Sequence, residues 1–137
     1  MRIFLRFFLV LSLLHGIVYG LDFKQTKVIK LKKDEQKKIL VKYDNIIKLF
    51  EFRWTLYKNG GLVIHRSYDK IISQNILYKR YKNNSFRLEL KSPGAGKYYN
   101  LPYILVKFED FDFKTDEAIF KLFLYDDAGN VSLKEIK

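Results

Sequence analysis

Apolar and polar residues alternate along much of the chain, and this alternation is typical of β-strands with one buried and one solvated face. The clearest example is residues 50–56. The two sides of this run are Phe50, Phe52, Trp54 and Leu56 against Glu51, Arg53 and Thr55. The pattern therefore predicts a half-buried strand at this position.

This strand is followed by Asn59-Gly60-Gly61 and then by a second apolar run over residues 62–68. Asn and Gly tolerate positive φ, so the combination predicts a β-hairpin. A two-residue loop would place Arg53 opposite Arg66, and like charges that face each other across a hairpin are unfavourable. We therefore expect a three-residue loop. It would pair Leu56 with Ile64, Trp54 with Arg66 and Phe52 with Tyr68.

Six further alternating runs predict strands at residues 26–32, 37–43, 86–90, 104–108, 118–125 and 131–136. Residues 69–82 fit either a short helix or strands joined through Asn83-Asn84, and we expect a strand in their second half. About eight short strands with regular turn signals indicate a β-sandwich or a barrel. A lipocalin-like small-ligand carrier, with aromatic residues around a central cavity, is the alternative that this pattern leaves open.

The first twenty residues have the features of a secretory signal peptide. Arg2 and Arg6 precede an apolar run from Phe7 to Leu14, and Val18-Tyr19-Gly20 fits a cleavage site. The apolar run is shorter than the roughly 20 residues that span a bilayer, so we expect cleavage after Gly20 rather than a retained anchor. The processed chain, residues 21–137, would be a single domain that does not span the membrane.

The chain contains no cysteine. Disulfide scaffolds, thiol catalysis and thiolate metal sites are therefore excluded, and an exported domain of this kind depends on its hydrophobic core. A bacterial envelope compartment fits this composition better than a eukaryotic secreted one, so we expect the periplasm.

Residues 116–132 resemble part of bacterial fibronectin type III and immunoglobulin-like domains. The segment "FLYDDAGNVS", residues 123–132, is similar to their last hairpin, and the preceding "TDEAIF" is similar to the loop that enters their penultimate strand. The matching residues are Tyr125, Asp127, Ala128, Gly129, Asn130 and Ser132. The resemblance implies an all-β fold, an immunoglobulin-like antiparallel β-sandwich of about seven to eight strands. It also implies that Trp54 is the core tryptophan of such a sandwich. It implies no particular function.

Basic residues exceed acidic ones by 11, and without Arg2 and Arg6 the net charge is +9. The excess is densest in the stretch "KVIKLKKDEQKK". A basic field of this kind attracts polyanions, whereas a lysine-rich strand edge also prevents strand-on-strand association. The first hypothesis predicts a binding face that consists of Lys30, Lys32, Lys33, Lys37 and Lys38.

We expect a non-catalytic binding module whose partner is an envelope protein or an anionic envelope component rather than nucleic acid. The hairpin over residues 53–66, with Trp54 and Arg66, is a second candidate binding surface. His65, the one histidine after Gly20, is expected to be an exposed strand residue without a catalytic role.

An acidic stretch from Glu109 to Glu117 supports two alternatives. A cation could bind there, since calcium prefers several oxygen ligands, although Lys114 and Thr115 break the EF-hand pattern. A pair of its carboxylates could instead serve a glycan hydrolase. The candidate residues are Asp110, Asp112, Asp116 and Glu117.

The segment "SPGAGKYYN", residues 92–100, is the one place that resembles a phosphate-binding loop. Lys91 stands where the first glycine of that motif belongs, and Tyr98 stands where the hydroxyl residue for magnesium belongs. No amphipathic helix follows. We therefore expect a loop between strands, and no cofactor.

Overall fold

The computed structural model describes residues 26–92 and 101–137, and all of its regular structure in these ranges is β-strand. The strands are β1 (Thr26–Lys32), β2 (Lys37–Tyr43), β3 (Ile46–Lys58), β4 (Gly61–Tyr68), β5 (Ile71–Tyr78), β6 (Ser85–Glu89), β7 (Tyr103–Asp112), β8 (Glu117–Tyr125) and β9 (Ser132–Ile136). No helix in the described residues is long and apolar enough to cross a membrane. The predicted signal peptide lies outside these residues.

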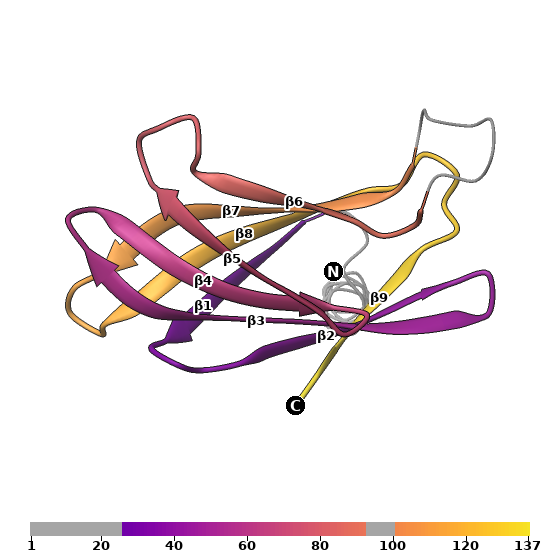
Figure 1. The fold of residues 1–137 in the computed structure, drawn as a ribbon, viewed down its shortest axis with the longest axis horizontal. Coiled ribbons are helices and arrows are strands. Elements are labelled where there is room, and N and C mark those ends of the chain that lie inside the picture. Colours follow the sequence, from indigo (N-terminus) through magenta and orange to yellow (C-terminus); the bar gives the residue numbers. More distant parts are fainter. Residues whose placement is uncertain (1–25, 93–100) are drawn as a thin grey trace, which may run out of the picture.

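The nine strands form two antiparallel sheets (Figure 1). One sheet has the order β1-β8-β7-β6, and the other has the order β5-β4-β3-β2-β9. The prediction of an all-β chain is thus confirmed, with nine strands where about seven to eight were expected. Within the five-stranded sheet, β2 to β5 are consecutive neighbours, whereas immunoglobulin constant-type sheets have the orders ABED and CFG.

Three two-residue turns join β2 to β5. They are Asp44-Asn45, Asn59-Gly60 and Asp69-Lys70, and every one of these residues has a positive φ. Such turns match the right-handed twist of the strands that they connect. The helix considered for residues 69–82 is not formed, because the Asp69-Lys70 turn starts β5 at Ile71.

The expected three-residue loop between β3 and β4 is wrong. The loop has two residues, and an irregularity between Trp54 and Leu56 shifts the register by one position. Arg53 consequently lies opposite His65, and the Arg53–Arg66 pair that argued against a two-residue loop does not arise. The same β-bulge turns Leu56 to the outer face, where it is 50% exposed, and turns Tyr57 toward the core.

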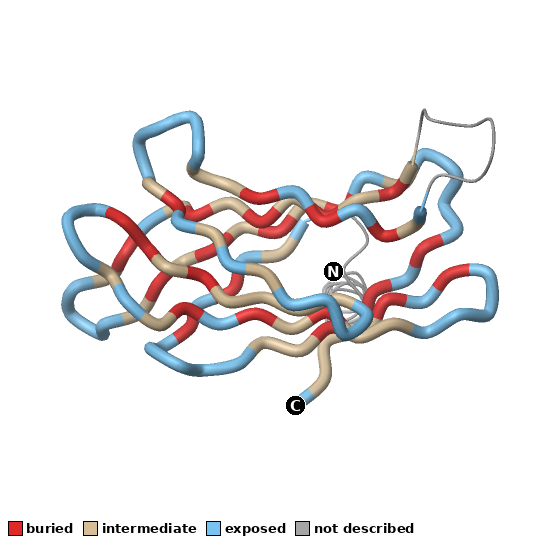
Figure 2. The backbone as a smooth tube through the Cα atoms, in the orientation of Figure 1, coloured by how far each residue is buried: buried red, intermediate tan, exposed pale blue. Residues whose placement is uncertain are grey.

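Aromatic rings fill the space between the two sheets. Buried and exposed residues alternate along the strands in Figure 2, as the sequence pattern predicted. Phe50 and Phe52 stack at 5.4 Å between ring centroids, and Phe52 meets the edge of Phe120 at the same distance. These rings pack on one another, so they are part of the core between the sheets.

Hydrogen bonds to Asp126 stabilise the turn after β8. The Asp126 carboxylate accepts a bond from the backbone N–H of Val131 at 2.7 Å, and its carbonyl accepts one from Gly129 at 3.2 Å. Gly129 has a φ of 69°, which suits glycine. β8 and β9 lie in different sheets, so this turn connects the two sheets and does not close the hairpin that the resemblance to fibronectin-type domains predicted.

Candidate functional site

The two sheets meet differently on the two sides of the molecule. On the side of β1 and β9, which we call the closed side, the Glu135 carboxylate pairs with both Lys27 and Lys37. All three residues share the inward register of their strands. Trp54 adds a bond from its Nε1 to the carbonyl of Leu31 at 2.7 Å. These contacts connect the four-stranded sheet to the five-stranded one.

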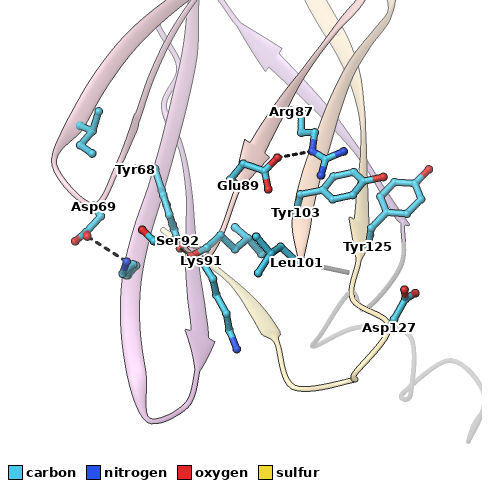
Figure 3. Close-up of a pocket in the computed structure, with 13 residues that line it drawn as sticks. Tyr68, Asp69, Arg87, Glu89, Lys91, Ser92, Leu101, Tyr103, Tyr125 and Asp127 are labelled. Atoms are coloured by element: carbon cyan, nitrogen blue, oxygen red, sulfur yellow. Dashed lines mark hydrogen bonds and ion pairs between the residues drawn. The ribbon is translucent and has the colours of Figure 1, made fainter. Parts of the chain in front are cut away.

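On the side of β5 and β6, which we call the open side, a groove extends from the gap between the sheets around β6 to the outer face of the four-stranded sheet, where Arg87, Tyr103 and Tyr125 lie. Its main cleft has a volume of ≈ 690 Å³, which is within the range of ligand sites. Figure 3 shows the residues around it. They are Lys48, Tyr68, Asp69, Ile71, Arg87, Glu89, Leu90, Lys91, Ser92, Leu101, Tyr103, Tyr125 and Asp127.

The three cations that line the cleft each face a carboxylate. Lys48 pairs with Asp69 at 3.2 Å, Arg87 pairs with Glu89 at 2.6 Å, and Lys91 pairs with Asp44 at 2.8 Å. Contacts with the Tyr43 and Asp69 side chains raise the pKa of Lys48, against the lowering effect of burial. The rim of the cleft therefore offers hydrogen-bond donors and acceptors side by side.

Tyrosine rings form a second part of the cleft. Tyr103 and Tyr125 stack at 4.5 Å with an interplanar angle of 16°, and the Arg87 guanidinium lies 3.6 Å from the Tyr103 ring centroid. These rings lie beside each other on neighbouring strands in Figure 3. Across the cleft, the Tyr68 hydroxyl donates to the carbonyl of Leu90 at 2.8 Å, and burial raises the pKa of Tyr68.

Arg66 occupies the inner part of the same groove. A smaller hollow that contains Arg66 and Ser73 shares Tyr68, Ile71, Arg87 and Glu89 with the main cleft, and Glu89 pairs there with Arg87 rather than with Arg66. The Arg66 guanidinium lies 4.4 Å from the Phe86 ring centroid and donates from Nη1 to the carbonyl of Arg87 at 3.3 Å.

The charge of Arg66 has no partner in the described part of the chain. Its Nε is buried without a hydrogen-bond partner there, and no carboxylate of those residues pairs with the guanidinium. Burial lowers the pKa of Arg66 from its ordinary value. The guanidinium nevertheless stays protonated at neutral pH, because arginine side chains do not lose their proton in proteins. The groove thus contains an uncompensated, half-buried cation.

The five lysines of the predicted basic face do not share one face. Lys30 and Lys32 lie on the outer face of the four-stranded sheet, and Lys38 lies opposite Glu51 in the other sheet. Lys33 belongs to the β1–β2 turn, and Lys37 points inward to Glu135. Alternation along β1 and β2 separates these residues, because neighbours in a strand point to opposite sides.

Of the two hairpin residues, only Arg66 remains available to a ligand. Trp54 is 4% exposed and packs against Phe111 at 5.5 Å, so it is a core residue rather than a binding residue. The bulge in β3 places Arg66 opposite the buried Phe52, which turns the arginine side chain toward the groove.

The acidic stretch does not converge on one point. Asp110 pairs with Lys79 at 2.7 Å, and this bond lowers the pKa of the Asp110 carboxyl. The Asp112 carboxylate accepts bonds from the backbone N–H groups of Lys114 and Thr115 in the turn before β8. Asp116 takes a positive φ in that turn, and Glu117 lies opposite Lys32. Within the described ranges, no three acidic or histidine side chains form a group able to hold a metal ion.

Sequence reasoning missed most of the groove. Alternation places Arg87, Tyr103 and Tyr125 on the outer face of their sheet, but it does not show that a groove reaches them there. The stretch 93–100, with Tyr98 and Tyr99, lies outside the described residues. One signal was available: Asp69-Lys70 interrupts the apolar pattern and places Ile71 at the mouth of the groove.

Comparison with known proteins gave no match: no family model, no curated protein and no solved structure is similar to this chain. The functional argument consequently rests on the groove itself.

Proposed function

We propose that this protein is an exported, non-catalytic binding module of the cell envelope, and that its groove holds a carboxylate-bearing glycan. The observation that carries the proposal is the uncompensated guanidinium of Arg66 between the sheets. A ligand carboxylate would satisfy this group with a charge-assisted hydrogen bond, which is stronger than a neutral one.

The remainder of the groove favours a glycan over an acidic peptide. Sugar hydroxyls both donate and accept hydrogen bonds, and the rim presents both functions in its ion pairs around Lys48, Arg87 and Lys91. The Tyr103–Tyr125 pair adds a broad aromatic surface with polar hydroxyls, against which the apolar face of a sugar ring packs.

Two further parts of the proposal come from the sequence. The signal-like pattern of residues 1–20 supports export to the periplasm. The immunoglobulin-like class rests on the sequence resemblance alone, because the turn around Asp126 leads from one sheet to the other and the meander of β2 to β5 differs from the constant-type strand order. That class remains a prediction.

The test is calorimetric binding of an oligogalacturonate and of its neutral methyl ester to the purified protein. We expect the acid form to bind and Arg66→Met to weaken it by about tenfold or more, because a charged hydrogen bond is lost. Arg53→Met is the matched control, since Arg53 lies exposed on the outer face, and it should leave the affinity unchanged.

Three results would contradict the proposal. One is equal affinity for the acid and the ester, and another is an acidic peptide that binds at the Arg66 groove more tightly than the glycan. The third is an Arg66→Met variant that binds as the unaltered protein does. Arg66→Lys separates charge from geometry, because lysine retains the charge but loses the planar fork.

A further inference from the structure

β5 differs from the other three edge strands of the described sheets. β1 contains three lysines, β6 contains Arg87 and Glu89, and β9 contains Lys134 and Glu135, whereas β5 has the sequence IISQNILY without a single charge. Edge strands usually carry charges that prevent association with another strand. β5 lacks this protection in a chain of net charge +11.

The side chains of β5 are unusually exposed for apolar residues. Ile71 is 72% exposed, Ile72 is 80% exposed and Ile76 is 46% exposed. Ile76 continues an apolar row on the outer face, formed across the sheet with Leu56 and Val63. β5 is therefore the uncharged border of an apolar strip.

The free backbone groups of β5 follow from its hairpin. Tyr68 and Ile71 close a two-residue turn and so form a hydrogen-bonded pair, which assigns the odd-numbered residues of β5 to bonds with β4. The N–H of Tyr78 accordingly points away from β4, where it donates to the carbonyl of Asn83. Ile72, Gln74 and Ile76 share this direction, toward the free edge.

We propose that a second copy of this chain pairs with β5 in an antiparallel arrangement, with Gln74 on the two-fold axis. This register places Ile72 of each copy opposite Ile76 of the other copy, so that two such pairs form on the outer face. On the inner face it places Ser73 opposite Asn75, whose Oδ1 is buried without a partner among the described residues. The Ser73 hydroxyl of the second copy is a donor for that atom.

Charge favours a second copy at this strand and disfavours it elsewhere. Like charges repel when two copies approach through β1, because Lys30 and Lys32 line its outer face. At β5 no charges meet along the pair, and the register directs the end that carries Asp69 toward the end that carries Lys79 of the other copy. Within each copy Asp69 pairs with Lys48 and Lys79 pairs with Asp110, so both ends of the interface carry charges of both signs.

The dimer should be weak. A single strand pair buries less than the about 1,600 Å² of a standard interface, so we expect association in the micromolar range or weaker. Sedimentation velocity of the purified protein over a concentration series should show a reversible monomer–dimer equilibrium. Gln74→Lys should shift it at least tenfold toward monomer, because two lysines then face each other on the axis.

Ser132→Lys is the matched control, since it adds the same charge to the other edge of the same sheet. A Gln74→Cys variant provides a second measurement in a chain without cysteine. Opposed hydrogen-bonded residues lie about 5.5 Å apart, within the roughly 4.4–6.8 Å that a disulfide requires. Oxidation should cross-link Gln74→Cys rapidly and Ser132→Cys slowly.

A protein that stays monomeric at all concentrations and fails to cross-link through position 74 would overturn the proposal. Equal effects of Gln74→Lys and Ser132→Lys would do the same. Thermal unfolding of each variant establishes that a loss of dimer is not a loss of fold.

Discussion

The closed and open sides of the sandwich use inward-pointing charge in opposite ways. On the closed side, Lys27 and Lys37 both pair with Glu135, so each of these lysines has a carboxylate partner within the chain. On the open side, Arg66 points between the sheets without a carboxylate from the described residues. The first arrangement joins the sheets, and the second leaves a cation for a ligand to neutralise.

This difference shows why a count of charges says little about where a protein binds. The stretch from Lys30 to Lys38 is the densest group of lysines in the chain, but its members are divided among two outer faces, a turn and an ion pair. A single arginine in a groove is the stronger binding candidate, because a half-buried charge interacts more strongly with a ligand than a solvated one.

The largest loss of stability should come from a substitution that creates a cavity in the core on the closed side. Leu31→Ala truncates a fully buried side chain on the inner face of β1. We expect a loss of about 2–5 kcal/mol in the free energy of unfolding. Ile72→Ala on the open side should change it by no more than about 0.5 kcal/mol, since the side chain is exposed. Urea denaturation measures both, and equal losses would refute the contrast.

Glu135→Gln should have an intermediate effect. It leaves Lys27 and Lys37 side by side without their carboxylate, and we expect a loss of about 1–2 kcal/mol, between the values for exposed and buried ion pairs. The variant is isosteric, so the loss reflects charge rather than packing.

The same carboxylate predicts a pH dependence. Burial raises the pKa of Glu135, but hydrogen bonds from Lys27 and Lys37 outweigh it and hold the pKa below its ordinary value. The stabilisation is therefore complete above the unfolded pKa of about 4.3 and is lost as the pH falls through the lower folded pKa. In the Glu135→Gln variant, the free energy of unfolding should therefore fall less steeply as the pH is lowered below about 4.3. An unchanged pH dependence would show that Glu135 is not the group responsible.

Arg66→Met should have the smallest effect on stability. The substitution removes a desolvated charge that has no ion-pair partner in the described chain, and methionine can still pack on Phe86. We expect the free energy of unfolding to rise or fall by no more than about 0.5 kcal/mol. A loss of stability as large as that of Glu135→Gln would mean that Arg66 holds the two sheets together on the open side, as Glu135 does on the closed side.

The sequence predicts the strands well because alternation is a local property. Phe50, Phe52 and Trp54 are buried as their spacing predicts, and the ambiguity over residues 69–82 was resolved by one turn. The bulge near Thr55 was not predictable in this way, because one extra residue costs little locally and reverses every later side chain.

The groove was predictable only in part. Arg66 was recognised as a candidate, but its direction depends on the bulge, and its neighbours Phe86 and Arg87 come from the other sheet. Which strands face each other across a gap depends on packing between sheets, which a pattern along one strand does not encode.

The three tight turns between β2 and β5 also bear on how the chain folds. Each closes a hairpin from adjacent residues, whereas Lys37 and Glu135 meet across 98 positions. Local contacts form fastest because little loop entropy opposes them. We therefore expect residues 37–78 to assemble first as a nucleus, with β9 docking late, so that a nascent chain gains most of its larger sheet before its last strand is synthesised.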